Sequence, residues 1–264
     1  MELISLTLAA ALSAGISFAG VAARALTPLA GLFAFLIGLS VIAGTGWAGA
    51  LALGAFFVSS SAVSRLTERS QPAWVDAKAN RRDPWQVLAN GAMAGVGGVV
   101  GILVHPSLGM WIAVPALAAA GADTWATSIG MLSRRDPIHL VERRRVPKGT
   151  SGGVSLIGTA GGVAGSVLVA SSPLLAGAPL ALARFAVLIG AVGMVADSFL
   201  GATVQGRFEC PACGQPSERR RHRCGMPTRH VGGVRWLGND GVNLLATVLA
   251  GLAGWAWWLV CCSG

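Results

Sequence analysis

Charged residues are scarce in this sequence. Asp, Glu, Lys and Arg make up 12% of the 264 residues, hydrophobic residues make up 53%, and the mean hydropathy is +0.64. A soluble domain carries about twice that share of charge, so the composition excludes an ordinary soluble enzyme. It predicts an all-α, polytopic membrane protein that forms one transmembrane domain over residues 1–264. The net charge of +9 then reflects membrane topology, and no nucleic-acid partner is expected.

A positively charged segment is also missing before the first apolar run. The N-terminus therefore does not resemble a secretory signal, and we expect the first run to be a retained helix. Runs of roughly 17 to 25 apolar residues can span a membrane. About eight are found, with the boundary between the second and third at a short glycine-containing turn: Leu3–Ala22, Thr27–Ala43, Gly46–Val63, Trp85–Val104, Leu108–Leu132, Gly152–Ser171, Pro179–Thr203 and Asp240–Val260.

Basic residues are nearly absent from one set of loops. All but one of the 20 lysines and arginines fall in loops that eight spans place on the same side, and Arg184 is the exception. The positive-inside rule puts these loops in the cytoplasm and both termini outside. We therefore expect a protein of the cytoplasmic (inner) membrane whose active site faces the cytoplasm.

Acidic residues are rarer still, yet three lie in or at apolar helices. Of only 11 acids, Asp123 and Asp197 each lie roughly 12 Å from the cytoplasmic end of a helix, and Asp240 opens the last helix from the same side. Carboxylates at one depth repel each other strongly unless a cation lies between them, which predicts Mg²⁺. Pairing with loop arginines, or a protonated acid, is the alternative. Asn243 shares a helix face with Asp240, and Asn239 precedes it.

A Walker A phosphate loop is missing, but another glycine-rich segment suits phosphate. Its glycines permit close approach, its hydroxyls and lysine donate hydrogen bonds, and an apolar helix begins beside it. The alternative is a flexible turn beside positive-inside charge. The segment consists of Lys148, Gly149, Thr150, Ser151, Gly152 and Gly153.

The loop insert at 204–237 contains a candidate zinc site. Cys210 and Cys213 have zinc-knuckle spacing, and Cys224 follows. Either His222 or His230 would complete four tetrahedral ligands. A disulfide is disfavoured in the cytoplasm, so we expect a structural Zn²⁺ that folds this small loop.

Several segments together resemble one integral-membrane family, whose plant members include phytyl-phosphate kinase. They are also similar to dolichol kinase, phytol kinase and phosphatidate cytidylyltransferase, which are membrane enzymes that use CTP. The cysteine insert departs from the plant members. The matching segments are Gln86–Gly91, Asp123-Thr124-Trp125-Ala126, Gly149–Ser155, Asp197–Gly201 and Asn239–Asn243.

The resemblance implies transfer of the CTP γ-phosphoryl group to an isoprenoid monophosphate, of phytyl or geranylgeranyl type, at the membrane. Asp123 and Asp197 would hold Mg²⁺, while Asp240, Asn239 and Asn243 complete the metal or nucleotide site. The glycine-rich segment would bind the CTP phosphates.

A polar helix face would then hold the acceptor phosphate, and the lipid tail would lie between helices. This face comprises Arg82, Gln86 and Asn90, and Lys78 would bind the acceptor phosphate together with Arg82. Two alternatives remain open. One is a cytidylyltransferase that acts at the α-phosphorus, and the other is a lipid-phosphate transporter or flippase in which the intramembrane acids relay protons.

Overall fold

Apolar helices form most of the molecule. The computed structural model describes residues 5–70, 81–214, 216–217, 221–222 and 224–261. The helices among them are α1 (Leu6–Ala22), α2 (Pro28–Thr67), α3 (Pro84–Leu103), α4 (Pro106–Gly130), α5 (Leu156–Ser171), α6 (Leu180–Thr203) and α7 (Asn239–Cys261), with short 3₁₀ helices η1 (Glu68–Ser70) and η2 (Ser172–Ala176).

Within the described residues, five helices are long and apolar enough to cross a membrane. They are α2, α3, α5 extended by η2, α6 and α7, whereas α1 is shorter. This confirms a helical integral membrane protein. The predicted apolar runs correspond to the observed helices, with two runs in α2, and the count of eight spans stays a prediction.

The predicted turn within α2 coincides with a break in the helix. Gly46 has φ 65° and ψ −152°, which is not helical geometry. Glycine adopts this conformation readily because it lacks a Cβ. Two helical segments therefore meet at the glycine that the sequence placed between two apolar runs.

Helix α4 lies at the centre of the bundle. It packs against α2, α3, α5, α6 and α7, and every residue from Leu108 to Ala122 is buried. Small residues allow backbones to approach closely in such a bundle. Beyond Ala122 the helix is only partly buried, and this is where Asp123 begins the polar end of α4.

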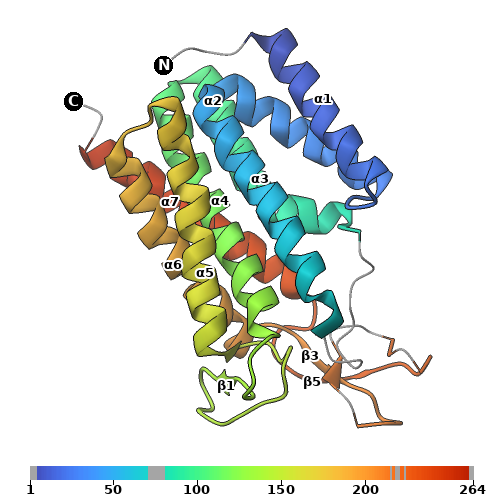
Figure 1. Cartoon of the computed structure of the whole chain (residues 1–264). Coiled ribbons are helices and arrows are strands. Elements are labelled where there is room, and N and C mark those ends of the chain that lie inside the picture. The colour runs from blue at the N-terminus through green and yellow to red at the C-terminus, as the bar shows by residue number, and fades with distance from the viewer. Residues whose placement is uncertain (1–4, 71–80, 215, 218–220, 223, 262–264) are drawn as a thin grey trace.

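Two small antiparallel sheets lie together at one end of the bundle, opposite the Cys261 end of α7 (Figure 1). In the first, Ile138 of β1 (Ile138–His139) pairs with Val154 of β2 (Gly153–Val154). The second has the order β4 (Pro216–Ser217), β3 (Arg207–Glu209), β5 (Arg229–Gly232). The sequence predicted loops here and not strands.

The start of α5 differs from the prediction. The sixth apolar run was expected to begin a helix at Gly152, but α5 begins at Leu156 and Ser155 caps it by accepting a hydrogen bond from the Gly158 N–H at 3.2 Å. Gly152 has φ +76°, which a right-handed helix does not accommodate, and Gly153 belongs to β2. The glycine-rich segment is therefore a turn and strand that precede the helix.

Candidate functional site

A cavity of about 650 Å³ opens at the sheet-bearing end of the bundle. Its walls come from the ends of α4, α5 and α6, from the whole segment 148–155, and from residues of the loop insert. Its volume lies in the range of small-molecule sites in proteins. Most of the predicted nucleotide-binding residues therefore line one cavity.

Two of the three predicted acids meet at this cavity. Asp123 of α4 and Asp197 of α6 both line it, and their carboxyl groups lie within hydrogen-bonding distance of each other. Asp197 is buried, with 8% of its surface exposed. Two ionised carboxylates so close would repel each other, so the arrangement requires a shared proton or a cation.

The third acid is placed differently. Asp240 lies in the first turn of α7, and its neighbour Asn239 lines the cavity while Asp240 does not. Among the described residues, no cluster of three or more metal-binding side chains contains these acids. The expected three-carboxylate cluster is therefore reduced to a pair, because the first turn of α7 directs Asn239 to the cavity.

Asn243 supports the acid pair from α7. With its amide nitrogen facing the acceptors, it donates to Asp197 Oδ2 at 2.7 Å and to the Asn239 carbonyl at 3.3 Å. Asn243 is 9% exposed, so these contacts are shielded from solvent. Asn243 thus orients one carboxylate of the pair, and its expected role in nucleotide binding stays a prediction.

The glycine-rich segment approaches α6 very closely. A Cβ added at Gly152 would lie 2.4 Å from the Cβ of Ala202, and Gly149 and Gly152 both have positive φ. The turn is closed by hydrogen bonds from the Thr150 N–H to the Pro147 carbonyl at 3.2 Å and from the Gly153 N–H to the Thr150 carbonyl at 3.0 Å. Only glycine at 152 permits this packing, which holds the turn against the helix that carries Asp197.

Lys148 is anchored within reach of the cavity. Its Nζ donates to the Met131 carbonyl at the end of α4, at 3.2 Å, and the residue lines the cavity. An ammonium group has three donors. The contact with Met131 uses one of them, so the side chain retains donors for an anion in the cavity.

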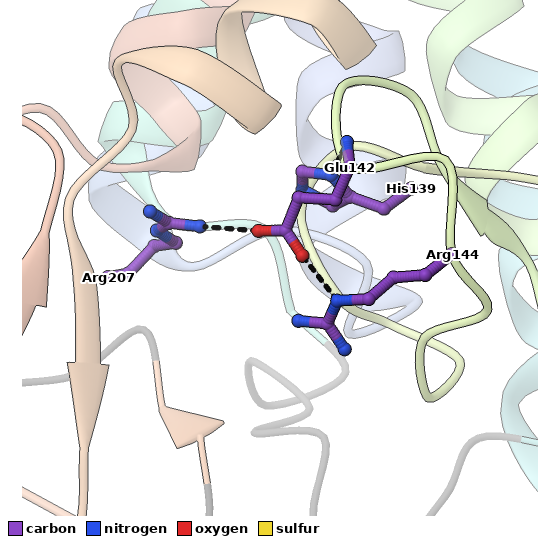
Figure 2. A network of polar contacts seen from close by, with 4 residues as sticks. All are labelled: His139, Glu142, Arg144 and Arg207. Atoms are coloured by element: carbon purple, nitrogen blue, oxygen red, sulfur yellow. Dashed lines mark hydrogen bonds and ion pairs between the residues drawn. The ribbon is translucent and has the colours of Figure 1, made fainter.

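An ion-pair network joins the two loops beside the cavity (Figure 2). Glu142 accepts from Arg144 Nε at 2.5 Å, and its other oxygen lies 3.6 Å from Arg207 Nη1. The buried His139 accepts from the Glu142 N–H through Nδ1 at 3.1 Å. The hydrogen bond from Arg144 holds the pKa of Glu142 below its ordinary value. Glu142 thus ties the loop after α4 to β3 of the insert.

Several cavity residues were missed by sequence reasoning. Thr127 lies one turn after Asp123 on the same helix face, so helical spacing could have identified it, whereas Ser198 is adjacent to Asp197 and has no such signal. The insert residues carry no such signal, because their position depends on how the insert folds back. The missed polar residues are Thr127, Thr159, Ser198, Gln205, Arg207, Glu209 and Ser217.

The predicted acceptor-phosphate group does not line the cavity. Gln86 forms a capping box with Asp83, and Asn90 donates to the Gln86 carbonyl at 2.8 Å. The Arg82 guanidinium lies 5.5 Å from the centre of the Phe56 ring, and burial lowers its pKa to about 10. Lys78 lies outside the described residues.

The predicted cysteine cluster is assembled. The ligand atoms of Cys210, Cys213, His222 and Cys224 all lie within 4.8 Å of one another, and the group could hold a metal ion. His222 is therefore the histidine of the cluster. His230 instead packs edge-on against Phe208, with 5.4 Å between the ring centres.

Comparison with known proteins agrees with this architecture. The family described as integral membrane protein DUF92 matches residues 11–251. The chain belongs to this family. No solved structure matches it.

Similar proteins occur in plants, archaea and cyanobacteria. The chain is 30% identical to Protein PGR of Arabidopsis thaliana over 50% of this chain and 49% of that protein. It is 27% identical to an uncharacterized membrane protein of Methanocaldococcus jannaschii, over 53% of this chain and 48% of that protein. It is 25% identical to an uncharacterized membrane protein of Synechocystis, over 70% of this chain and 74% of that protein. The matches therefore span about half the length of the first two relatives and three quarters of the third.

Proposed function

We propose that this member of the DUF92 family is a membrane-embedded, CTP-dependent kinase that phosphorylates an isoprenoid monophosphate to the diphosphate. The observation that carries the proposal is the pair Asp123 and Asp197, which meets in the same cavity as the glycine-rich segment. Acids and phosphate-binding groups facing one cavity suit a nucleotide with its metal ion. The proposal places this cavity at the cytoplasmic face, where the loops are basic.

The acid pair fits Mg²⁺. This ion takes one or two carboxylates together with substrate phosphates, and a cation between Asp123 and Asp197 would relieve their repulsion. Asn243 would hold Asp197 in the orientation that such binding needs. When bound, Mg²⁺ supplies positive charge that stabilises the charge developing on the transferred group.

The chain's own groups would position the phosphates. The amides of the two positive-φ glycines, Gly149 and Gly152, and the Lys148 ammonium would bind the CTP phosphates, while the internal hydrogen bonds of Thr150 and Gly153 hold the turn in shape. In the reaction an acceptor phosphate oxygen forms a bond to the γ-phosphorus while the bond to the β-phosphate oxygen breaks, releasing CDP. The acceptor oxygen is already ionised, so no strong general base is required.

The acceptor phosphate would enter the same cavity. In-line transfer requires donor and acceptor phosphates side by side, and Arg82, Gln86 and Asn90 do not line this space. Lys148 and Arg207 are the cationic side chains among its described lining residues. Arg207 therefore replaces the expected face of α3 as the group proposed to meet the acceptor.

The test is an assay of the purified full chain in detergent with CTP, Mg²⁺ and either phytyl or geranylgeranyl phosphate. Formation of CDP and a lipid diphosphate is expected. Release of pyrophosphate would replace the kinase by a cytidylyltransferase. Absence of any CTP consumption with both lipids would refute the proposal. A structural Zn²⁺ in the cysteine cluster completes the proposed set of cofactors.

A further inference from the structure

The four ligand atoms of the cysteine cluster lie close enough together for one metal ion to contact them all. Cys210 Sγ lies 3.5 Å from Cys224 Sγ, Cys213 Sγ lies 3.5 Å from His222 Nδ1, and His222 Nδ1 lies 3.1 Å from Cys224 Sγ. Zinc–sulfur and zinc–nitrogen bonds of usual length separate tetrahedral ligand atoms by about 3.5 to 3.8 Å. The observed spacings are close to this range, and three thiols with one imidazole form a donor set that selects Zn²⁺.

The sheet that carries the cluster has very little core of its own. Its strands have two to four residues, and Phe208 is its large buried side chain, at 8% exposed. The cysteines of the cluster are not joined by a disulfide. Small modules of this kind need a metal or crosslink because hydrophobic burial alone does not offset the chain entropy lost on folding.

The same sheet forms one wall of the cavity. Glu209, which lines the cavity, directly precedes Cys210, and Gly214, which also lines it, directly follows Cys213. Two of the four ligands are thus chain neighbours of cavity residues. Ser217 of β4 pairs with Phe208 of β3 and lines the cavity as well. A change in the cluster is therefore expected to displace this wall of the cavity.

The base of the insert is closed independently of the cluster. The Gly206 N–H donates to the Leu237 carbonyl at 2.8 Å, and the Val234 N–H donates to the Val204 carbonyl at 2.8 Å. These bonds join the end of α6 to the approach to α7 without using the cysteines. Loss of the metal is therefore expected to loosen the wall while the bundle and the Asp123–Asp197 pair remain in place.

We propose that Cys210, Cys213, His222 and Cys224 bind one Zn²⁺ ion that holds β3 and β4 in place as a wall of the cavity, so that metal occupancy controls whether this wall is formed. The ion has four protein ligands and no open position, so it acts through structure and not as a reagent. The ion keeps Arg207 and Glu209 of β3 facing the cavity. Arg207 of this strand also forms the ion pair with Glu142. This role does not depend on which ligand the cavity takes.

The experiment uses the full chain in detergent and two readouts that need no activity. Zinc content is measured by elemental analysis, and hydrogen exchange is followed by mass spectrometry on peptides covering Arg207–Gly214. Wild type is expected to carry about one zinc per chain. The double variant Cys213→Ser/Cys224→Ser is expected to lose it, and its β3 amides are expected to exchange at least about 10-fold faster. Peptides from the buried part of α4 should exchange at the wild-type rate.

Two controls guard against general misfolding. Cys261→Ser changes a cysteine at the opposite end of α7 and should retain zinc and slow exchange. Wild type stripped with a chelator should reproduce the fast exchange of β3, and returning Zn²⁺ should reverse it. Zinc retained by the double variant, or zinc-free protein with unchanged exchange in β3, would overturn the proposal. Because CTP is absent from these measurements, failure of the kinase proposal would leave their result unaffected.

Discussion

The carboxyl groups of Asp123 and Asp197 lie within hydrogen-bonding distance although they belong to different helices, α4 and α6. Asn243 on a third helix, α7, donates to the second of them at 2.7 Å. The bundle thus brings two like charges together and supports one of them with a neutral donor. Such an arrangement is costly unless a proton or a cation offsets the repulsion, and it is the centre of the proposed activity.

Removing either carboxylate should abolish phosphoryl transfer. Asp123→Asn and Asp197→Asn are each expected to lower CTP turnover by at least about 100-fold, because a ligand for charge-stabilising Mg²⁺ is lost. The thermal unfolding midpoint without Mg²⁺ should not fall, since repulsion within the pair disappears. Turnover is measured as CDP release. The matched control is Asp136→Asn, an exposed acid in the loop after α4 that should keep full turnover. Full turnover by Asp123→Asn would remove this residue from the mechanism.

The thermal stability of variants at Asn243, which contacts Asp197, should respond to Mg²⁺. Asn243→Ala is expected to destabilise the protein by about 1–3 kcal/mol through the lost hydrogen bond to a charged group. Asn243→Asp adds a third negative charge, so its unfolding temperature should fall further in EDTA and recover more than that of Asn243→Ala when Mg²⁺ is added. Thermal unfolding of both variants with and without Mg²⁺ measures this. Equal responses to Mg²⁺ would argue against a cation at the acid pair.

Two glycine variants can separate the cost of steric overlap with α6 at Gly152 from the cost of a positive φ alone. Gly152 and Gly177 have nearly the same φ, +76° and +75°, but a Cβ would meet Ala202 only at Gly152 and nothing within 4 Å at Gly177. Gly177→Ala should cost about 1 kcal/mol for the left-handed conformation. Gly152→Ala should cost about 1–3 kcal/mol more through overpacking, and should weaken CTP binding. Similar unfolding temperatures for the two variants would contradict the close packing.

The tie between the two loops should weaken in acid. The folded-state pKa of Glu142 lies below its ordinary value of 4.5 because of the hydrogen bond from Arg144. The stabilisation that ionised Glu142 gives to the folded loops is therefore complete above pH 4.5, and it is lost as the pH falls through the lower folded-state pKa. Hydrogen exchange of the 138–145 loop should accelerate in that window. Glu142→Gln should exchange fast at neutral pH and show no such acid step, whereas an unchanged acid step would assign the titration to another group.

The orientation in the membrane can be read from cysteine labelling. Cys261 is exposed at the end of α7, away from the sheets, and the positive-inside rule predicts that this end lies outside the cell. A membrane-impermeant maleimide should label it in intact cells, and the double variant Cys261→Ser/Cys262→Ser should lose this label. Labelling only after permeabilisation would invert the topology and place the cavity outside.

Local patterns in the chain were sufficient for several parts of this site. The acids at Asp123 and Asp197, the glycine-rich segment and the three cysteines of the candidate zinc site were predicted from residue type and spacing, because each is a short-range signal with a direct chemical reason. The Gly46 break was likewise predicted where a glycine turn interrupts an apolar run. The expected acceptor residues Arg82, Gln86 and Asn90 do not line the cavity, and their role stays a prediction, since a shared helix face does not say which neighbour that face meets.

Apolar runs and charge asymmetry by themselves determined that this is a helical membrane protein with a polar loop end, because lipid permits few other arrangements of such a chain. Residue spacing added the three cysteines of a cluster that could hold a metal ion. Only the tertiary structure decided that Asn239 and not Asp240 lines the cavity, that Asn243 supports an acid, that His222 and not His230 joins the cysteines, and that Arg207 and Glu209 form a wall. These outcomes depend on how helices and loops distant in sequence pack together, which no local pattern of residues encodes.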